Sequence, residues 1–208
     1  HAINLLKTRG QLPRQLPVFL DSPMAVNATS VFQEHPELFD KETQEFIREG
    51  RHPALNFKGL NYVRSVEESK AINYMDQPAI VISASGMLQN GRILHHLRHN
   101  ISDPRNTILI VGWQAPDTLG RNLINGVKEA TIYGDRYEVE AQVVQISGFS
   151  AHAGQDMLMR YALASKNTLR KVILVHAEAQ VAGTFAQSLK DAGVPEVEFP
   201  DLYQAVEI

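Results

Sequence analysis

Two histidines stand directly after short apolar stretches of the sequence. "VVQISGFSAH" ends at His152, and "KVILVH" ends at His176. A neutral imidazole nitrogen binds zinc, and a histidine with a pKa near neutrality exchanges protons with a phosphate ester or a leaving group. A single histidine in such a place is more often a partly buried structural residue. Two at equivalent positions, on strands that could be neighbours, give the structural and the functional interpretation equal weight.

The two histidines would serve different chemistry. His176 can offer a ring nitrogen to zinc, whereas the positive end of a following helix would disfavour a positive charge on His152 and suit it to proton exchange. A catalytic zinc takes about three protein ligands, and nothing beside His176 supplies the others. The residues by themselves therefore predict half a metal site.

Small and hydroxyl-bearing residues follow the other predicted strands. "ISASGMLQNGR" and "VGWQAPDTLGR" each end in an arginine. Small residues let a phosphate approach backbone N–H groups, and the forked donors of arginine match its geometry. We therefore expect a phosphate cradle that draws on Ser85, Gly86, Arg92, Thr118, Arg121 and Ser150. The alternatives are ordinary turn chemistry for the loops, a helix N-cap for Ser150, and solvated positions for both arginines.

Two further polar groups favour structural interpretations. Asp21, in "FLDSPMA", is predicted to cap the helix that begins near Met24 rather than to act as a catalytic carboxylate. His95 and His99, in "HHLRH", have the i, i+4 spacing of a metal pair on a helix. No carboxylate or cysteine lies near them, so an exposed amphipathic face is the preferred account.

The elements that carry these residues alternate in type. Apolar stretches predict strands at 17–20, 79–83, 107–112 and 171–176, with a further strand near Tyr62. Helices are predicted at 25–35, 36–49, 65–74, 86–100, 153–165 and 179–192. The alternation indicates an α/β fold with a mostly parallel sheet, covered by helices on both faces. In such a sheet, ligands bind at the carboxyl ends of the strands, where the predicted site residues lie.

The pattern changes at about residue 126. "EATIYGDRYEVEAQVVQIS" contains two alternating strands around Gly134-Asp135, which predicts a hairpin. We therefore expect two domains, residues 1–126 and 127–208. The capping-box spacing of Ser65 and Glu68 predicts a helix that begins there.

Composition limits the classes of protein. The 208 residues are 44% apolar and 21% charged, as in soluble globular proteins, and no apolar run approaches the ~20 residues of a membrane span. The absence of cysteine excludes thiolate zinc sites and fits a reducing compartment, so a cytoplasmic location is expected. A net charge of -3 argues against a generally basic nucleic-acid binder, although a local basic groove remains compatible with it. The opening "HAINLLKTRGQLP" resembles the end of a helix and suggests a piece of a longer protein.

The ordered motifs "LDSPMA", "SASGMLQNGR", "TLGR", "GFSAHA" and "LVHAE" resemble the β-CASP branch of the metallo-β-lactamase superfamily. The resemblance runs from about Leu16 to Leu189. It implies that residues 1–126 are most of a β-CASP domain, which caps the active site and holds RNA. Residues 127–208 would then be the C-terminal part of the metallo-β-lactamase αββα fold, including the RNA-specificity region.

The resemblance also implies roles for the two histidines. His152 matches the second β-CASP motif, a histidine near the scissile phosphate, and His176 matches the third, a ligand to one of two zinc ions. The family reaction is hydrolysis of an RNA phosphodiester by a zinc-activated water. The implied partners are RNA, in single-stranded form, and an N-terminal metallo-β-lactamase half. A second copy of the chain is a further candidate partner, and no membrane is expected.

Two departures from the family pattern bear on activity. The chain contains no His-x-His-x-Asp-His motif, which belongs to the N-terminal half of the family fold, and Ala177 replaces the usual glycine after the zinc-binding histidine. We therefore expect a metal-dependent ribonuclease as the longer protein, but no activity from this chain alone. The alternatives are a non-catalytic RNA-binding scaffold, or a nuclease for DNA or a hydrolase for another phosphoester. A small-molecule phosphate binder is disfavoured because neither G-x-G-x-x-G nor a P-loop occurs.

Overall fold

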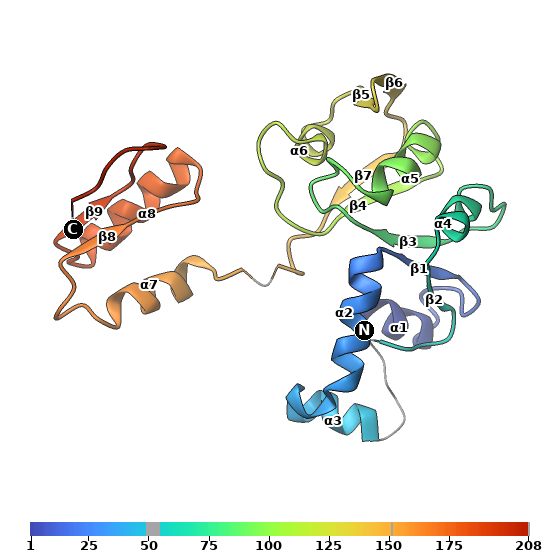
Figure 1. Ribbon diagram of the computed structural model, residues 1–208, viewed down its shortest axis with the longest axis horizontal. Coiled ribbons are helices and arrows are strands. Elements are labelled where there is room, and N and C mark those ends of the chain that lie inside the picture. Colours follow the sequence, from blue (N-terminus) through green and yellow to red (C-terminus); the bar gives the residue numbers. More distant parts are fainter. Residues whose placement is uncertain (49–54, 151, 208) are drawn as a thin grey trace. The chain divides into compact units, whose positions relative to one another are not determined.

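A computed structural model describes the chain except for residues 49–54, 151 and 208 (Figure 1). The chain divides into two compact units, His1–Ser150 and Ala151–Ile208. Both mix helices with short strands, and every parallel pairing in them joins strands separated by a helix. The predicted α/β class is therefore confirmed. Among the described residues, no helix is both long enough and apolar enough to cross a bilayer.

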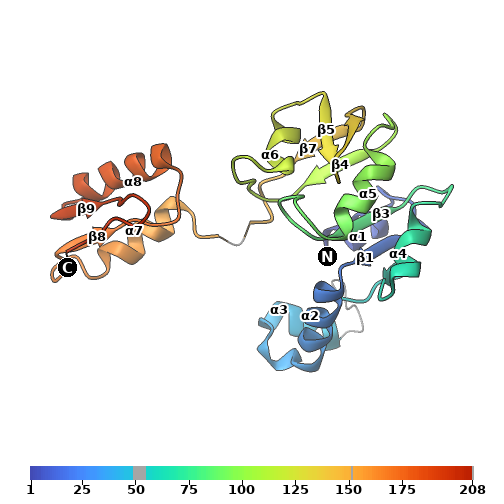
Figure 2. The same ribbon diagram turned by 45° about the horizontal axis from the view of Figure 1, so that its top comes forward.

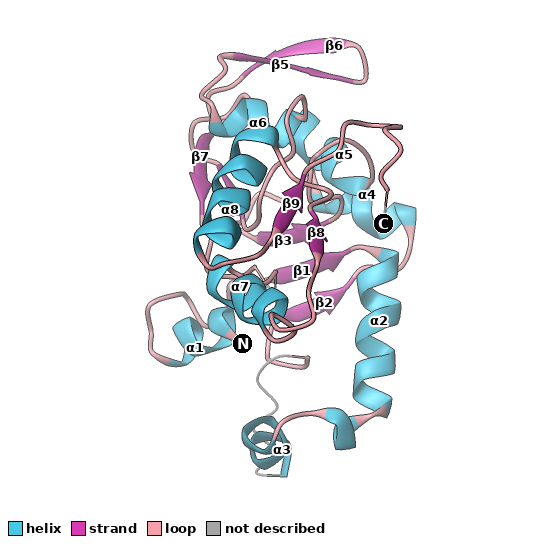
Figure 3. Cartoon of the chain, turned by 90° about the vertical axis from the view of Figure 1, so that its left-hand side faces the viewer, coloured by secondary structure: helices cyan, strands magenta, loops and turns pink. Residues whose placement is uncertain are grey.

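The first unit contains a three-stranded parallel sheet in the order β2-β1-β3 (Figure 3). Its strands are β1 (Val18–Asp21), β2 (Leu60–Tyr62) and β3 (Ile80–Ser83). Val18 of the central strand is completely buried and aligns with Leu60 on one side and Ile80 on the other. The strands predicted at 17–20, at 79–83 and near Tyr62 are therefore confirmed.

A second parallel pair and a hairpin complete the strands of this unit. β4 (Thr107–Ile110) pairs with β7 (Gln142–Gln145), and β5 (Glu129–Ile132) pairs antiparallel with β6 (Asp135–Glu138). The two turn residues of the hairpin, Tyr133 and Gly134, both have positive φ, the backbone that a tight two-residue connection requires. The predicted hairpin around Gly134-Asp135 is therefore confirmed.

The main hydrophobic core of this unit lies around β4, the hairpin and two helices. Its most buried members are Ile101, Leu123 and Ile132. The other face of β4 departs from the expected double coverage, because Leu109 and Val111 each expose about half of their surface (50% and 49%). The apolar stretch at β4 thus packs only one of its faces within the structure.

Six helices and one 3₁₀ turn are described in the first unit. They are α1 (Ala2–Thr8), α2 (Pro23–Glu34), η1 (Pro36–Leu38), α3 (Lys41–Arg48), α4 (Val66–Ile72), α5 (Arg92–Asn100) and α6 (Leu119–Ile124). The capping box predicted for α4 is present, with Ser65 accepting from the Glu68 backbone and Glu68 accepting from that of Ser65.

Two predicted helices of the first unit have different limits. The helix predicted at 36–49 is divided into η1 and α3, because the Asp40 side chain accepts the Thr43 N–H and starts a new helix, and residue 49 lies outside the described residues. The helix predicted at 86–100 begins only at Arg92. Residues 84–91 instead form a closed turn in which Ser85 N–H donates to the Asn90 carbonyl.

The second unit contains α7 (Gln155–Leu163), β8 (Lys171–Ile173), α8 (Ala179–Asp191) and β9 (Glu196–Glu198). β8 and β9 are parallel, and α8 packs beside β9 (Figure 2). The strand predicted at 171–176 ends at Ile173. Its partner β9 is only three residues long, and Pro200 lacks the N–H that would extend the ladder.

Candidate functional site

Asp21, the last residue of β1, is a carboxylate with no exposed surface. The hydroxyl of Ser69 donates to its Oδ2 at 2.6 Å, and the Nε2 atom of His96 lies 2.6 Å from the same oxygen. Arg92 donates from Nη1 to Oδ1, also at 2.6 Å. An unpaired carboxylate in this position would cost several kcal/mol. The partners from α4 and α5 satisfy it, so this cluster ties both helices to β1.

The predicted cap role of Asp21 is wrong. Ser22 is the N-cap of α2, since it has extended backbone angles and its side chain accepts from the Ala25 N–H at 3.3 Å. Pro23 then occupies the first helical position, where a missing N–H has no cost. Successive side chains of a strand point to opposite faces, so Asp21 turns into the interior while Ser22 faces the helix.

Two opposing effects act on the pKa of Asp21. Burial raises the pKa, but hydrogen bonds from Ser69, His96 and Arg92, together with the positive charge of Arg92, lower it further than burial raises it. The net result is a pKa below the ordinary value of an aspartate. The carboxylate is therefore ionised throughout the neutral range and acts as a fixed internal charge.

Arg92 faces this carboxylate. Its guanidinium also donates to the carbonyls of Val63 and Arg64, each at 3.4 Å, and only 18% of its side chain is exposed. A phosphate would have to share the guanidinium with Asp21. The phosphate-binding role of Arg92 stays a prediction, while its structural role is directly visible.

His96 is a functional-looking residue that the sequence reasoning missed. Its Nδ1 atom lies 2.7 Å from Oδ1 of Asn73, opposite the contact with Asp21. The spacing of Arg92 and His96 could have predicted that they act together, because residues four apart share one face of a helix. His95 and His99, the pair with metal-ligand spacing, each contact a tyrosine instead. His95 contacts the Tyr133 hydroxyl at 3.1 Å, and the His99 ring lies 5.9 Å from that of Tyr74.

The loops that follow β3 and β4 contact each other. The side chain of Gln114 is only 2% exposed, and its Nε2 donates to the carbonyl of Gly86 at 2.9 Å. The Gly120 N–H donates to the Met87 carbonyl at 3.3 Å. Gln114 therefore joins the two segments in which Ser85, Gly86, Thr118 and Arg121 were predicted to bind phosphate.

Gly120 explains why the "TLGR" motif contains a glycine. A Cβ atom at this position would lie 1.7 Å from Oε1 of Gln114, closer than any non-bonded contact permits. That oxygen is buried and has no hydrogen-bond partner among the described residues. The close approach of α6 to Gln114 thus depends on the missing side chain.

The hydroxyls predicted to bind phosphate also hold these loops. Thr118 caps α6, accepting from the Arg121 N–H at 3.2 Å and donating to the Ala115 carbonyl at 2.7 Å. Ser85 accepts from the backbone of Gln89 and Asn90 at 3.3 and 3.4 Å. Arg121 donates from Nε to the Gln114 carbonyl at 2.7 Å, and its guanidinium lies 5.7 Å from the centre of the Trp113 ring.

His152 and His176 lie in the second unit, and both are exposed. Neither directly follows a strand as predicted, because β7 ends at Gln145 and β8 ends at Ile173. His176 has a φ of 63°, a left-handed backbone in which histidine is enriched over most side chains. His152 precedes α7, whose N-cap is Gly154. The N-cap interpretation of Ser150 is therefore wrong, because the helix begins at Gln155 and the extended backbone of Gly154 already fills the cap position.

The residues present do not complete a zinc site. Within the described parts of the chain, no three or more His, Cys, Asp or Glu side chains are grouped so that they could hold a metal ion. His176 can supply one imidazole ligand, which is fewer than the three that a catalytic zinc takes. The predicted ligand role of His176 and the predicted approach of His152 to the phosphate loops stay predictions.

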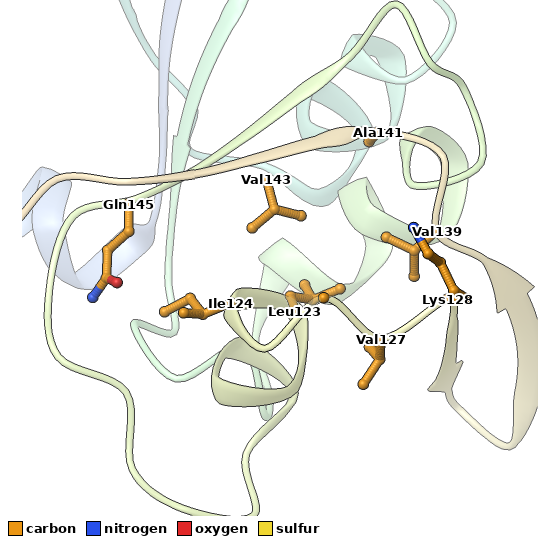
Figure 4. A pocket seen from close by; sticks show the side chains of 9 residues that line it. Leu123, Ile124, Val127, Lys128, Val139, Ala141, Val143 and Gln145 are labelled. Carbon is orange, nitrogen blue, oxygen red and sulfur yellow. The ribbon is translucent and has the colours of Figure 1, made fainter.

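A cavity of about 320 Å³ opens elsewhere in the first unit (Figure 4). Val143 of β7 faces Leu123 and Ile124 of α6 across it. Its lining combines aliphatic side chains with Lys128 and Gln145 and includes none of the predicted site residues. Its described lining offers these two polar side chains alone, so it lacks the convergent polar groups of a catalytic site.

Comparisons with known proteins cover both units. A family model described as the Beta-Casp domain matches residues 1–123, and one described as the Zn-dependent metallo-hydrolase RNA specificity domain matches residues 136–198. Ribonuclease TTHA0252 of Thermus thermophilus is 38% identical over 176 residues, which are 85% of this chain and 40% of that protein.

Two relatives from Methanocaldococcus jannaschii are also similar. Transcription termination factor FttA is 33% identical over 84% of this chain and 28% of its own length. An RNase J-like protein is 28% identical over 85% of this chain and 39% of its own length. The chain thus spans less than half the length of these curated relatives.

The buried position of Asp21 predicts a large effect of its removal. Asp21→Asn should lower the free energy of unfolding by roughly 3–5 kcal/mol at neutral pH, because Arg92 loses the charge that compensates it and the contacts of Ser69 and His96 with Oδ2 are disrupted. Urea unfolding followed by circular dichroism measures this. Asp76→Asn, at an exposed carboxylate of the same unit, should change stability little.

The same carboxylate predicts acid sensitivity. A folded-state pKa below the unfolded value of about 3.9 contributes stability at neutral pH that disappears on acidification, beginning below about pH 5. Urea midpoints over this range should therefore fall more steeply in the wild type than in Asp21→Asn. Parallel pH profiles would contradict the assigned role.

The close contact between Gly120 and Gln114 predicts that substitutions at these two positions change stability non-additively. Gly120→Ala should lower stability by about 1–3 kcal/mol, whereas Gly112→Ala, where a Cβ meets open space, should stay within about 0.5 kcal/mol of the wild type. Thermal and urea unfolding of Gly120→Ala, Gln114→Ala and the double variant measure the coupling. A double variant as unstable as the sum of the two would refute the proposed clash.

Proposed function

Because the chain belongs to the β-CASP family, we propose that it is the RNA-binding part and one portion of the active site of a zinc-dependent ribonuclease. Residues 1–126 would form the β-CASP domain, and residues 127–208 would belong to the metallo-β-lactamase fold. The substrate is RNA in single-stranded form, and the reaction is hydrolysis of its phosphodiester bonds.

One observation carries this proposal. The match to the zinc-dependent RNA specificity domain spans residues 136–198, which include both His152 and His176. A relative named ribonuclease, 38% identical over 85% of this chain, supports RNA hydrolysis as the activity of the longer protein. The absence of cysteine supports a reducing compartment such as the cytoplasm.

The two histidines have separate roles in this proposal. His176 donates one imidazole nitrogen to a zinc ion, and the remaining ligands come from an N-terminal half of the longer protein. His152 contacts the scissile phosphate or exchanges its proton. Exposure suits both side chains, since a catalytic or ligand imidazole has to reach an ion or substrate beyond its own loop.

The loops joined by Gln114 hold the RNA backbone in this proposal. Arg121 supplies positive charge, and Ser85, Gly86, Thr118 and Ser150 supply small or hydroxyl-bearing positions beside which a phosphate can lie. Gln114 and Gly120 keep the two loops of the first unit in place before RNA binds. With a net charge of -3 for the chain, binding has to come from this local region and should depend strongly on salt.

RNA binding by the chain tests the first part of the proposal. Arg121→Ala should weaken binding of unrelated single-stranded RNA oligomers to a similar extent, and should reduce the slope of log affinity against log salt by about one. Fluorescence anisotropy of labelled RNA over a salt series measures both. Arg105→Ala, which removes an exposed arginine of the same unit, is the matched control.

One result would contradict the RNA-binding role of Arg121. Arg121→Ala would bind RNA as the wild type does, with the same salt slope, while circular dichroism shows an intact fold. The phosphate cradle would then fail at Arg121. A comparable loss in Arg105→Ala would instead mean that binding follows overall charge rather than this region.

The metal and the chemistry are tested in the longer protein that carries the N-terminal zinc motifs. His176→Ala should lower bound zinc and abolish most turnover, whereas His152→Ala should lower turnover by about 10²–10⁴-fold and leave zinc content unchanged. Metal analysis and cleavage of labelled RNA measure the two effects. Equal zinc loss in both variants would show that the roles are wrongly assigned.

The 208-residue chain itself should not hydrolyse RNA with added zinc, because its described residues supply too few ligands. RNase activity that survives repeated purification but disappears in His176→Ala would contradict this expectation.

A further inference from the structure

Trp113 is the only tryptophan in the sequence and lies in the loop that follows β4. Its side chain is 55% exposed, although Ile110, three residues earlier, is a buried member of the core. A large aromatic ring with one side against the protein and one side in water is the type of surface that recognises flat ligands. Trp113 was not among the residues singled out from the sequence.

Arg121 holds this ring in a defined place. Its guanidinium lies over the ring, 5.7 Å from the centroid, and its Nε is fixed by the Gln114 carbonyl at 2.7 Å. Gln114 is in turn buried and tied to the carbonyl of Gly86. This contact favours one placement of the ring before a ligand arrives, which reduces the entropy lost on binding.

The residues around Trp113 indicate which chemical class of ligand fits the ring. A stacked arginine and tryptophan present a flat π surface beside a positive charge, which fits a nucleobase joined to a phosphate. The neighbouring Thr118 and Ser85 loops are polar, whereas Leu109 and Val111, four and two residues before Trp113, are exposed and aliphatic. An apolar protein segment would gain little from the charge, so a single-stranded nucleic acid matches the pair better.

We propose that Trp113 is a stacking platform for one base of single-stranded RNA, with Arg121 supporting the ring and attracting the adjoining phosphate. This inference rests on the proposed RNA-binding function and adds a base contact to its phosphate contacts. Every nucleobase has a π face, so the contact is independent of sequence apart from stronger stacking by purines.

The single tryptophan allows a direct measurement on the 208-residue chain. Tryptophan emission, excited selectively over the six tyrosines, reports only the Trp113 ring. Titration with oligoadenylate should therefore quench it, oligouridylate should quench it less, and an abasic oligomer of the same length should leave it nearly unchanged. Anisotropy of labelled RNA measures binding independently in the same solutions. Quenching that follows the anisotropy curve supports stacking.

Substitutions measure how much the proposed stacking contributes to RNA affinity. Trp113→Ala should weaken RNA binding by roughly 5- to 150-fold, the range for loss of one stacked base, and Trp113→Phe should retain most of the affinity. Leu109→Ala, which truncates an exposed apolar residue of β4, should bind RNA as the wild type does. Circular dichroism checks the fold of each variant, and the quenching of the wild-type ring by bound RNA decides the matter if the Ala variant unfolds.

The results distinguish the two proposals. If anisotropy shows RNA binding while the ring is not quenched and Trp113→Ala binds equally well, the stacking platform is refuted and the RNA-binding function stands. Unfolding of Trp113→Ala, with no quenching of the wild type by bound RNA, assigns the ring to protein packing and also refutes stacking. Absence of RNA binding in the anisotropy measurement removes both proposals.

Discussion

The buried charge of Asp21 is the constraint on which the first unit depends. A carboxylate taken out of water has to be matched by donors and positive charge, and here Ser69, Arg92 and His96 supply them from two helices. These contacts span 48 to 75 residues of sequence and converge on the end of the central strand. Meeting that single requirement fixes where α4 and α5 sit on the sheet.

The placement of α5 has consequences for the loops. Arg92 begins the helix, so its attachment to Asp21 also sets where the preceding turn closes. Gly91 has a φ of 79°, and a Cβ there would lie 2.7 Å from the Ala84 carbonyl oxygen. That turn presents the Gly86 carbonyl to Gln114, and Gln114 in turn holds Arg121 over Trp113. The proposed RNA contacts are thus the outer end of a chain of contacts that starts at a buried charge.

The motifs of the family therefore combine two kinds of residue. In the first unit, "LDSPMA", "SASGMLQNGR" and "TLGR" contain residues whose described partners are mainly other parts of the protein. In the second unit, "GFSAHA" and "LVHAE" place His152 and His176 on exposed loops. Under the proposed function, the hydrogen-bonded loops of the first unit would hold the RNA backbone, and the exposed imidazoles of the second would serve the reaction.

The sequence by itself determined the features that depend on neighbouring residues. Apolar stretches predicted β1, β3 and β4, the Ser65–Glu68 spacing predicted the start of α4, and the Gly134-Asp135 pair predicted the hairpin, because strand burial, caps and tight turns follow from local chemistry. Only the tertiary structure decided that Asp21 is an internal counter-charge, that Arg92 turns toward it, that His96 completes the cluster, and that Gln114 joins the loops. Each of these depends on which distant side chain meets a buried polar group, and residue type and spacing along one chain do not specify that partner.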